Sequence, residues 1–584
     1  MQRRLFLTAA AASAAASALA GCTPPRAELP GGFTGMDLAR GHQLRDLLRK
    51  SGHLPAPAVQ RRTQVLVAGG GVAGLAAARS LRLAGIHDFA LLELQDSAGG
   101  NSRAGSVAGI ACPLGAHYLP LPGSDAIEVQ DLLEELGLRQ RVAGRWQYGG
   151  DGGRHLCHSP QERLYWKGEW HPGLLPVDGV GQETLAQYRR FAALVDALRQ
   201  TTRFAMPAFT QWQPNQPLAP AQLALDAVNF DTWLAQQGLH DPHLRWYLDY
   251  CCRDDYGAGS ARVSAWAGVH YFASRHGFAA PGSADGADGA DGGDSAGASE
   301  PEGVLTWPEG NGWLTRQLAA PLQAAGQLHT GCSVLRIREG RQGVEVDALH
   351  HASGTVERWQ AERCIVALPV FVAARVLHNP PGFVTAAAER LQWAPWLVAN
   401  IHLDGPLQDR PGAAPSWDNV LYQDANPGGL GYVDAGHQRL SPLPAPTVLS
   451  YYQALGDVPG GRAQLQQLPW THWQGAILAT LAGPHPDIAQ RATRMELTRY
   501  GHAMAIPVPG MQRFLSQIGL QRTQNKRRQL SNGEQARALP TPATARLAFA
   551  HSDWSGYSVF EEAFTRGHGA GLHAAAAAAQ ALGY

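Results

Sequence analysis

Residues 63–93 place the strongest constraint on the fold of this 584-residue chain. Residues 64–68 (Gln-Val-Leu-Val-Ala) form a short apolar run rich in β-branched residues, as in a buried parallel strand. Residues 69–74 (Gly-Gly-Gly-Val-Ala-Gly) follow, and the alanine- and leucine-rich residues 75–84 predict a helix. A second apolar run, 89–92, ends at Glu93. Strand, Gly-x-Gly-x-x-Gly turn, helix, strand and acid in this order predict a dinucleotide-binding unit.

Each part of this unit has a physical role. The first glycine permits a tight turn, the second leaves the backbone open to a pyrophosphate, and the third lets helix and strand pack closely. The start of the helix offers free N–H groups and a partial positive charge to phosphates. The acid, 19 residues after the last glycine, is spaced to accept hydrogen bonds from a ribose hydroxyl. A glycine-rich turn also occurs without any ligand, and these glycines do not distinguish FAD from NAD. The predicted contacts are Gly69, Gly71, Val72, Ala73, Gly74 and Glu93.

Size and composition exclude several classes of protein. A chain of 584 residues exceeds the size of one hydrophobic core, so two or more domains are expected. The 48 basic and 48 acidic residues balance, which gives no electrostatic case for nucleic acid as a partner. The seven cysteines contain no Cys-x-x-Cys pair and no zinc spacing, so no metal site is predicted.

Residues 1–22 are predicted to be a signal peptide. Residues 1–4 are basic and residues 5–20 are apolar, a run shorter than the roughly 20 residues needed to span a bilayer. Residues 3–7 (Arg-Arg-Leu-Phe-Leu) resemble a twin-arginine export motif. Residues 19–22 (Leu-Ala-Gly-Cys) resemble a lipobox that would lipidate Cys22; the alternative is an ordinary secretory signal with a chance cysteine. We therefore expect an exported lipoprotein on the periplasmic side, anchored in the inner or the outer membrane.

The residues after Glu93 resemble a known family. Residues 97–103 (Ser-Ala-Gly-Gly-Asn-Ser-Arg) and 114–119 (Leu-Gly-Ala-His-Tyr-Leu) resemble the flavin amine oxidase superfamily. That group includes monoamine and polyamine oxidases, protoporphyrinogen oxidase and phytoene-desaturase-like enzymes. The resemblance implies FAD as the cofactor, with the second glycine pair along its diphosphate and ribityl chain. It assigns this role to Gly99, Gly100, Asn101 and Arg103, with Asn101 standing where arginine is commoner in the family.

Two later stretches extend the resemblance. In residues 330–337, Val334 matches the residue that packs near the adenine. In residues 548–563, Asp553 matches an acid that contacts the ribityl chain or phosphate, and residues 558–561 match the start of a helix that points at the flavin. Ser558 and Phe560 belong to that helix start.

The resulting fold prediction is α/β with two domains. A Rossmann-like FAD-binding domain is expected from residues 63–124, 303–371 and 545–584, and an α+β substrate domain from residues 125–302 and 372–544. Apolar runs at 397–403, 448–453 and 476–481 predict strands of the substrate domain, and residues 164–170 predict a hairpin. Residues 23–62 are expected to be a tether with one amphipathic helix at 36–50, and residues 280–302 a flexible loop.

Catalytic residues are harder to predict. The resemblance implies transfer of a hydride equivalent to the flavin, with a lysine near the flavin, yet residues 399–403 contain no lysine and Asn400 is the nearest candidate. Tyr557 ends a Trp-Ser-Gly-Tyr run that matches the aromatic cage of monoamine oxidases, although the spacing to the following acids is about two residues longer. His117 follows a Gly-Ala pair in a segment that passes near the flavin in the family. His117 and His502 also fit purely structural roles.

Three functions remain open from the sequence. The first is an exported FAD-dependent oxidoreductase of the amine oxidase type, acting on a small molecule such as an amine and passing electrons to O2 or a quinone. The second is a phytoene- or protoporphyrinogen-type dehydrogenase that takes an apolar substrate. The third is a non-catalytic flavin-binding electron-carrier lipoprotein, which the missing lysine permits. The sequence leaves the substrate, the electron acceptor and the oligomeric state open.

Overall fold

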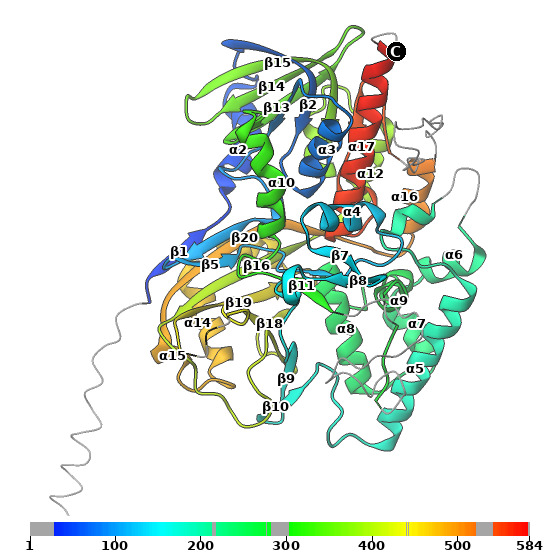
Figure 1. The fold of residues 1–584 in the computed structure, drawn as a ribbon, viewed down its shortest axis with the longest axis vertical. Helices are drawn as coiled ribbons and strands as arrows, with labels where there is room; N and C mark the ends of the chain where they lie inside the picture. Colours follow the sequence, from blue (N-terminus) through cyan, green and yellow to red (C-terminus); the bar gives the residue numbers. More distant parts are fainter. Residues whose placement is uncertain are drawn as a thin grey trace, which may run out of the picture.

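The structure is a computed structural model that describes residues 29–212, 218–275, 277–281, 303–439, 441, 443–520 and 541–581. The signal peptide predicted at residues 1–22, with Cys22, and nearly all of the loop expected at 280–302 lie outside these ranges. Figure 1 shows an upper lobe built on one sheet and a larger lower lobe with a second sheet and a group of helices. This mixed α/β architecture confirms the predicted fold class at that level.

The upper lobe is built on parallel strands from distant parts of the chain. The seven-stranded sheet has the order β12-β3-β2-β15-β14-β13, and β21 pairs with the end of β15. The pairs β12–β3, β3–β2, β2–β15 and β15–β21 are parallel, and β14 and β13 continue the sheet as antiparallel strands. Residues 65–68 of β2 have no exposed side-chain surface, as expected of a parallel strand covered on both faces. The bounds are β2 (Val59–Ala68), β3 (Phe89–Leu92), β12 (Leu328–His329), β15 (Thr355–Val366) and β21 (Leu547–Phe549).

The two faces of this sheet pack against different elements because successive side chains of β2 point in opposite directions. Val65 and Val67 join a core with α3 (Val72–Leu83), α10 (Gly312–Ala324) and α17 (Phe560–Ala581). Leu66 and Ala68 join a core on the other face. That core also contains residues of β13 (Cys332–Glu339), β14 (Val344–His350), α11 (Val370–Val376), α12 (Gly382–Arg390) and α16 (Met511–Leu520).

The lower lobe contains an eight-stranded, mostly antiparallel sheet. Its order is β1-β20-β16-β19-β18-β17-β9-β10, with parallel pairs at β1–β20 and β17–β9. The hairpin expected at residues 164–170 is confirmed as β9 and β10. The strand bounds are β1 (Gly31–Thr34), β9 (Glu162–Trp166), β10 (Glu169–Pro172), β16 (Gln392–Leu403), β17 (Asp418–Leu421), β18 (Gly429–Asp434), β19 (Thr447–Ala454) and β20 (Ala492–Ile506).

The strands expected at 397–403 and 448–453 are confirmed, and the strand expected at 476–481 is wrong. Those residues end helix α14 (Trp470–Leu481). Trp473, Ile477 and Leu481 are its buried residues, spaced four apart, so one helix face packs inward. A short, mostly apolar run such as this fits a helix or a strand equally well. The helical spacing becomes visible only when the preceding Trp473 is included.

Helices complete the lower lobe. Asn229 and Asp241 accept hydrogen bonds from backbone N–H groups at the starts of α7 and α8. Among the described helices, none combines the length and the hydropathy that crossing a bilayer requires. The helices of this lobe are α5 (Gln182–Thr201), α6 (Pro220–Asp226), α7 (Phe230–Gln236), α8 (Pro242–Tyr256), α9 (Ala265–Ala273), α13 (Gly461–Gln467) and α15 (Ile488–Arg491). Smaller elements are α4 (Ile127–Glu135), β4 (Ala104–Val107), β5 (Ile110–Pro113), β6 (Tyr118–Pro120), β7 (Arg139–Val142), β8 (Arg145–Tyr148) and β11 (Val304–Thr306).

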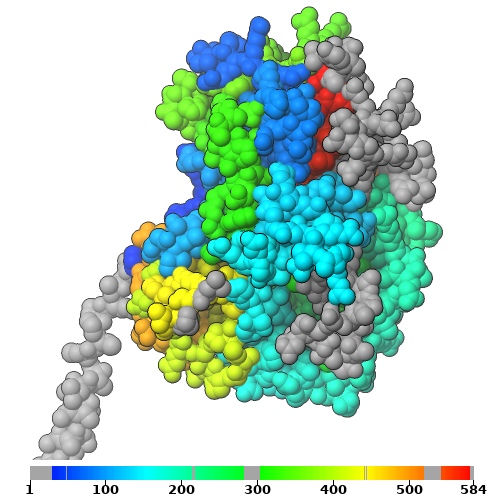
Figure 2. Space-filling view, in the orientation of Figure 1, coloured from blue at the N-terminus to red at the C-terminus, as the bar shows by residue number. Residues whose placement is uncertain are grey.

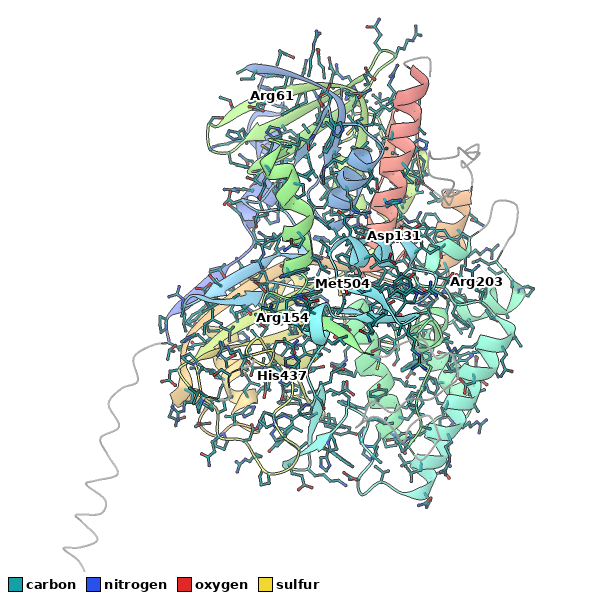
Figure 3. The ribbon with its side chains drawn as sticks, in the orientation of Figure 1. Arg61, Asp131, Arg154, Arg203, His437 and Met504 are labelled. Carbon is teal, nitrogen blue, oxygen red and sulfur yellow. The ribbon has the colours of Figure 1, made fainter. Side chains whose placement is uncertain are left out.

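The described part of residues 23–62 differs from the tether expected there. It contains β1 and the first four residues of β2, and helix α2 (Leu38–Ser51) confirms the helix expected at 36–50. Arg61, labelled in the upper lobe in Figure 3, forms a 2.7 Å ion pair with Glu357 of β15 and lies over the Trp359 ring. Strand β2 begins at Val59, before the predicted unit at residue 63, because β15 pairs with residues 59–62 as well.

We expect Gly74→Ala to destabilise the fold. An ideal Cβ at this position would lie 1.9 Å from the carbonyl oxygen of Gly69, so the helix and the turn would have to separate. Overpacking of this kind costs about 1–3 kcal/mol, which urea denaturation would report. The control is Gly41→Ala in α2, where a Cβ meets nothing within 4 Å, and which should be neutral or stabilising. Equal stability of Gly74→Ala and the parent protein would contradict this close contact.

Candidate active site

Two glycine turns face each other at the end of β2 and form what we call the glycine cradle, residues 69–71 and 99–100. Gly69 has a φ of +104°, and the N–H of Gly99 donates to the carbonyl of Gly70 at 2.7 Å. Gly71 pairs with Gly99 as an isolated bridge, and a Cβ on Gly100 would lie 3.1 Å from the Cα of Gly71. Side chains here would fill the space, so the cradle offers backbone groups to whatever binds.

The helix start and Glu93 border this cradle. Gly71 is the N-terminal cap of α3 and no side chain caps that helix. The buried Glu93 carboxylate accepts hydrogen bonds from the N–H groups of Gly70 (2.9 Å) and Gln95 (2.8 Å). Burial raises the pKa of Glu93 in spite of these bonds. A carboxylate has about four acceptor positions, so it can still accept bonds from ribose hydroxyls. An uncapped helix start and a buried acceptor fit the pyrophosphate and ribose of a dinucleotide.

Asn101 and Arg103 make contacts that tie the cradle to other parts of the chain. Asn101 Nδ2 donates to the carbonyl of Ala503 at 2.7 Å. The neighbouring Met504 lies at the junction of the two lobes in Figure 3, so Asn101 links the lobes. The buried Arg103 donates from Nε to the carbonyl of Gly100 at 3.3 Å. Val334 lies half-buried on β13, on the sheet face opposite α3.

Asp553 lies buried in a short turn before α17. Its Oδ2 accepts hydrogen bonds from Val370 N–H (2.9 Å) and from Trp393 Nε1 (3.2 Å). Burial alone would raise the pKa of Asp553, but the nearby His551 and these donors hold it below its usual value. Asp553 therefore binds protein groups in this structure, and one of them is the N–H of Val370 at the start of α11.

His502 packs on Phe371 with ring centroids 4.4 Å apart, and burial lowers the pKa of His502 to about 4.

Helix α17 brings the third predicted segment against the first. A Cβ on Gly567 would lie 2.0 Å from the carbonyl oxygen of Ala73, so the backbones of α17 and α3 are in direct contact. Phe560 opens α17 and is buried against α3. Ser558 Oγ accepts a hydrogen bond from Ala505 N–H at 2.8 Å.

The three catalytic candidates occupy different surroundings. Asn400 donates to the carbonyl of Pro113 at 3.0 Å and accepts from Ser450 Oγ at 2.6 Å, so both ends of its amide are bonded within the protein. Tyr557 is fully buried and stacks on His270, with ring centroids 5.0 Å apart, among the helices of the lower lobe. Asn400 is bonded to Pro113, and His117 lies in the loop that begins directly after Pro113. Tyr557 is not part of this group.

His117 belongs to a group of rings that we call the aromatic wall: His117, Tyr118, Trp417 and Tyr452. The His117 ring centroid lies 4.9 Å from that of Tyr118, 5.5 Å from Trp417 and 4.4 Å from Tyr452. Burial lowers the pKa of His117 to about 3, which keeps the imidazole neutral. Aromatic faces attract ammonium and other organic cations by about 0.5–2 kcal/mol.

Three acids that sequence reasoning did not single out lie beside this wall, and we call them the acid cluster: Glu162, Asp254 and Asp418. Asp418 and Glu162 are Cα partners across β17 and β9. Tyr118 Oη donates to Asp254 Oδ2 at 3.3 Å, which joins the cluster to the aromatic wall. Within the described ranges, no three His, Cys, Asp or Glu side chains are grouped as a metal site would require.

Burial and mutual repulsion disfavour ionisation in the acid cluster. Burial raises the pKa of Glu162 to about 7 and, with help from Asp255, that of Asp254 to about 7. Burial and the other two acids raise the pKa of Asp418 well above its usual value. Like charges opposite each other in a sheet are destabilising, and a cation between them would relieve the repulsion.

The loop of residues 114–117, with Tyr118 at the start of β6, runs between the glycine cradle and the acid cluster. The carbonyl of Asn101 accepts a hydrogen bond from Ala116 N–H at 2.9 Å. The carbonyl of Gly115 accepts from Tyr452 Oη at 3.0 Å, and that of Leu114 accepts from Tyr500 Oη at 2.8 Å. Contacts of this loop thus run from Asn101, next to the cradle, to Tyr118 and Asp254.

Comparisons with known proteins agree with this geometry. The sequence profile of the family described as flavin containing amine oxidoreductase matches residues 72–570. No curated protein matches the sequence at a significant level.

Solved structures resemble the fold along nearly its whole length. Putrescine oxidase bound to putrescine is 17% identical, with a TM-score of 0.59 over 90% of this chain and 100% of that chain. Cyclohexylamine oxidase from Brevibacterium oxydans is 17% identical, with a TM-score of 0.55 over 89% and 100%. A CLA-producing fatty acid isomerase from P. acnes is 13% identical, with a TM-score of 0.55 over 87% and 97%. At these identities the likeness concerns the fold alone.

The acid cluster predicts how stability depends on pH. The pKa of Glu162 is about 7 in the folded protein, above the roughly 4.3 of an unfolded glutamate. Between these values the folded chain keeps a proton that the unfolded chain releases, so stability falls as the pH rises toward 7. We expect Tm to drop between about pH 5 and pH 8, and Glu162→Gln to reduce that drop. Exchange of the exposed Glu389 for glutamine serves as the control. An unchanged pH dependence in Glu162→Gln would contradict the raised pKa.

Proposed function

Because this chain belongs to the flavin containing amine oxidoreductase family, an FAD-dependent group of oxidoreductases, we propose that it is exported and oxidises a cationic amine. The observation that carries the proposal is the acid cluster facing the aromatic wall, beside the loop that runs from the glycine cradle. Carboxylates and ring faces together suit a positively charged, partly apolar ligand.

We assign FAD to the three predicted segments, residues 63–124, 303–371 and 545–584. The cradle glycines and the start of α3 would hold the diphosphate, and Glu93 the ribose. Val334 and Arg103 would border the adenosine and phosphate region, and α17 would extend toward the flavin. When bound, FAD supplies the acceptor for a hydride equivalent from the C–H beside the amine nitrogen.

The residues of this chain would bind and orient the amine. Glu162, Asp254 and Asp418 would surround an ammonium group, and its single positive charge would favour the ionised form of one carboxyl, whose proton would leave to solvent. The aromatic wall would cover the hydrocarbon part of the substrate and exclude water. An uncharged polyene or tetrapyrrole would leave these buried carboxyls unpaired, which argues against an apolar substrate.

The electron acceptor and the location are part of the same proposal. The strand that carries Asn400 has no lysine, and Asn400 is committed to Pro113 and Ser450, so O2 and a quinone both remain candidate acceptors. The twin-arginine motif and the lipobox in residues 1–22 support export as a lipoprotein anchored through Cys22.

The amine proposal predicts which compounds reduce the bound flavin. We expect the purified holoprotein to lose its visible flavin absorbance when titrated anaerobically with small primary or secondary amines. Asp254→Asn should raise the amine concentration for half reduction about 10- to 100-fold, because a hydrogen bond to a charged group contributes about 1.5–3 kcal/mol. Glu389→Gln should leave it unchanged. Bleaching by polyprenyl or tetrapyrrole compounds and by no amine would overturn the proposal. Reoxidation in air, compared with a soluble quinone, would identify the acceptor.

Glu93→Ala tests the cofactor assignment separately. We expect it to weaken FAD binding about 10- to 100-fold, since one charge-assisted bond to the ribose is lost. The flavin-to-protein absorbance ratio after dialysis would measure the effect, and circular dichroism would check that the fold is intact. Full FAD occupancy in this variant would show that Glu93 is misassigned.

A further inference from the structure

Residues 31–51, which we call the N-terminal cap, connect the two lobes. Strand β1 pairs with β20 of the lower sheet, from Gly31 opposite Met495 to Thr34 opposite Thr498. Figure 1 shows the blue chain rising from β1 to α2 beside the upper sheet, and Figure 2 shows blue residues where the outline narrows between the lobes. The cap therefore crosses from the lower sheet to the cofactor lobe.

The first contact of the cap is with the predicted phosphate region. Arg103 Nη2 donates to the carbonyl of Gly35 at 2.5 Å and lies against the sulfur of Met36. The same guanidinium also donates to the carbonyl of Gly100 in the cradle. The cap thus fixes the orientation of an arginine that borders the glycine cradle.

The second set of contacts is with the residues that directly follow Glu93. The N–H of Asp37 donates to Gln95 Oε1 at 3.2 Å. Arg40 Nη1 donates to the carbonyl of Leu94 at 3.3 Å and pairs with Asp96 at 2.7 Å. Residues 94–96 directly follow Glu93, the predicted ribose acceptor at the end of β3. The cap therefore lies beside the predicted adenosine part of the site.

Helix α2 is held there by an apolar face. Leu44 and Leu47 pack against Leu335, Leu349 and Val356 of the β13–β15 hairpins. The same hairpins contact Glu93, whose carbonyl accepts a hydrogen bond from Cys332 N–H at the start of β13 at 2.8 Å. The cradle, β13 and the cap thus all contact residues 93–96, where the adenosine is assigned.

We propose that the N-terminal cap encloses the adenosine half of FAD, so that FAD enters and leaves only when residues 35–47 move away. This inference rests on FAD lying at Glu93 and is independent of the substrate. Because β1 and α2 are held by different lobes, the cap also links cofactor retention to the contact between the lobes.

The direct test cuts the cap after the protein has folded. The exposed connector around residues 52–57 accepts an inserted protease site, and the loaded holoprotein is cleaved there. We expect cleavage to speed FAD release at least tenfold, measured as the rise in flavin fluorescence after dilution. Unchanged release, with the cap shown to dissociate on gel filtration, would overturn the proposal.

A point variant tests the same idea without cleavage. Arg40→Ala removes the contacts with Leu94 and Asp96 and should also speed FAD release about tenfold. Arg45→Ala, on the exposed side of the same helix, is the matched control and should release FAD as the parent does. Hydrogen exchange of residues 35–47 should be slower in the FAD-loaded protein than in the apoprotein. Equal exchange in both forms, together with equal release from the two variants, would show that the cap does not enclose the cofactor.

Discussion

The pairing of β15 with strands from both ends of the chain is the contact on which the structure depends. Residues 357–366 run parallel to β2, and residues 364–366 also pair with β21 near the C-terminus. β15 thereby fixes the position of the glycine turn after β2 relative to α17, the helix after β21. The close backbone approach of α17 to α3 follows from it, while that of Gly71 to Gly99 follows from the pairing of β2 with β3. A binding surface made of backbone requires that kind of rigid support, since no side chain can move to compensate for a misplaced turn.

The lower lobe, in contrast, contains ionisable side chains in its interior. Glu162 and Asp418 lie side by side on neighbouring strands, close to Asp254. Burying these carboxyls lowers the stability of the folded protein relative to one with apolar side chains at the same positions. Buried groups with strongly shifted pKa values are a common feature of functional sites. The neutral His117 and its neighbouring rings complete a boundary that is apolar on one side and acidic on the other.

The sequence predicted those parts of the protein whose physics is local. Gly69, Gly71 and Gly74 and the acid at 93 follow one another within one supersecondary unit, so their spacing carries the information. The acid cluster has no such signal, because residues 162, 254 and 418 are brought together only by the parallel pairing of β17 with β9 and by the packing of α8. The prediction of a strand at 476–481 was wrong because these residues are only the second half of α14, and the spacing of its buried face starts at Trp473. The parallel pairing of β1 with β20 could not be seen either, since four residues carry too little pattern to identify a strand. The assignment of site residues to FAD and of the domain boundaries remains a prediction from motif order.

The pairing of β1 with β20 also has a consequence for the order in which the protein is made. Gly31 is opposite Met495, a separation of 464 residues, so the first strand to leave the ribosome is among the last to find its partner. Until residues 495–498 are made, β1 has no partner in the lower sheet. During that time α2 can be held only by its contacts with the upper lobe, at Leu94, Asp96 and the face of β13–β15.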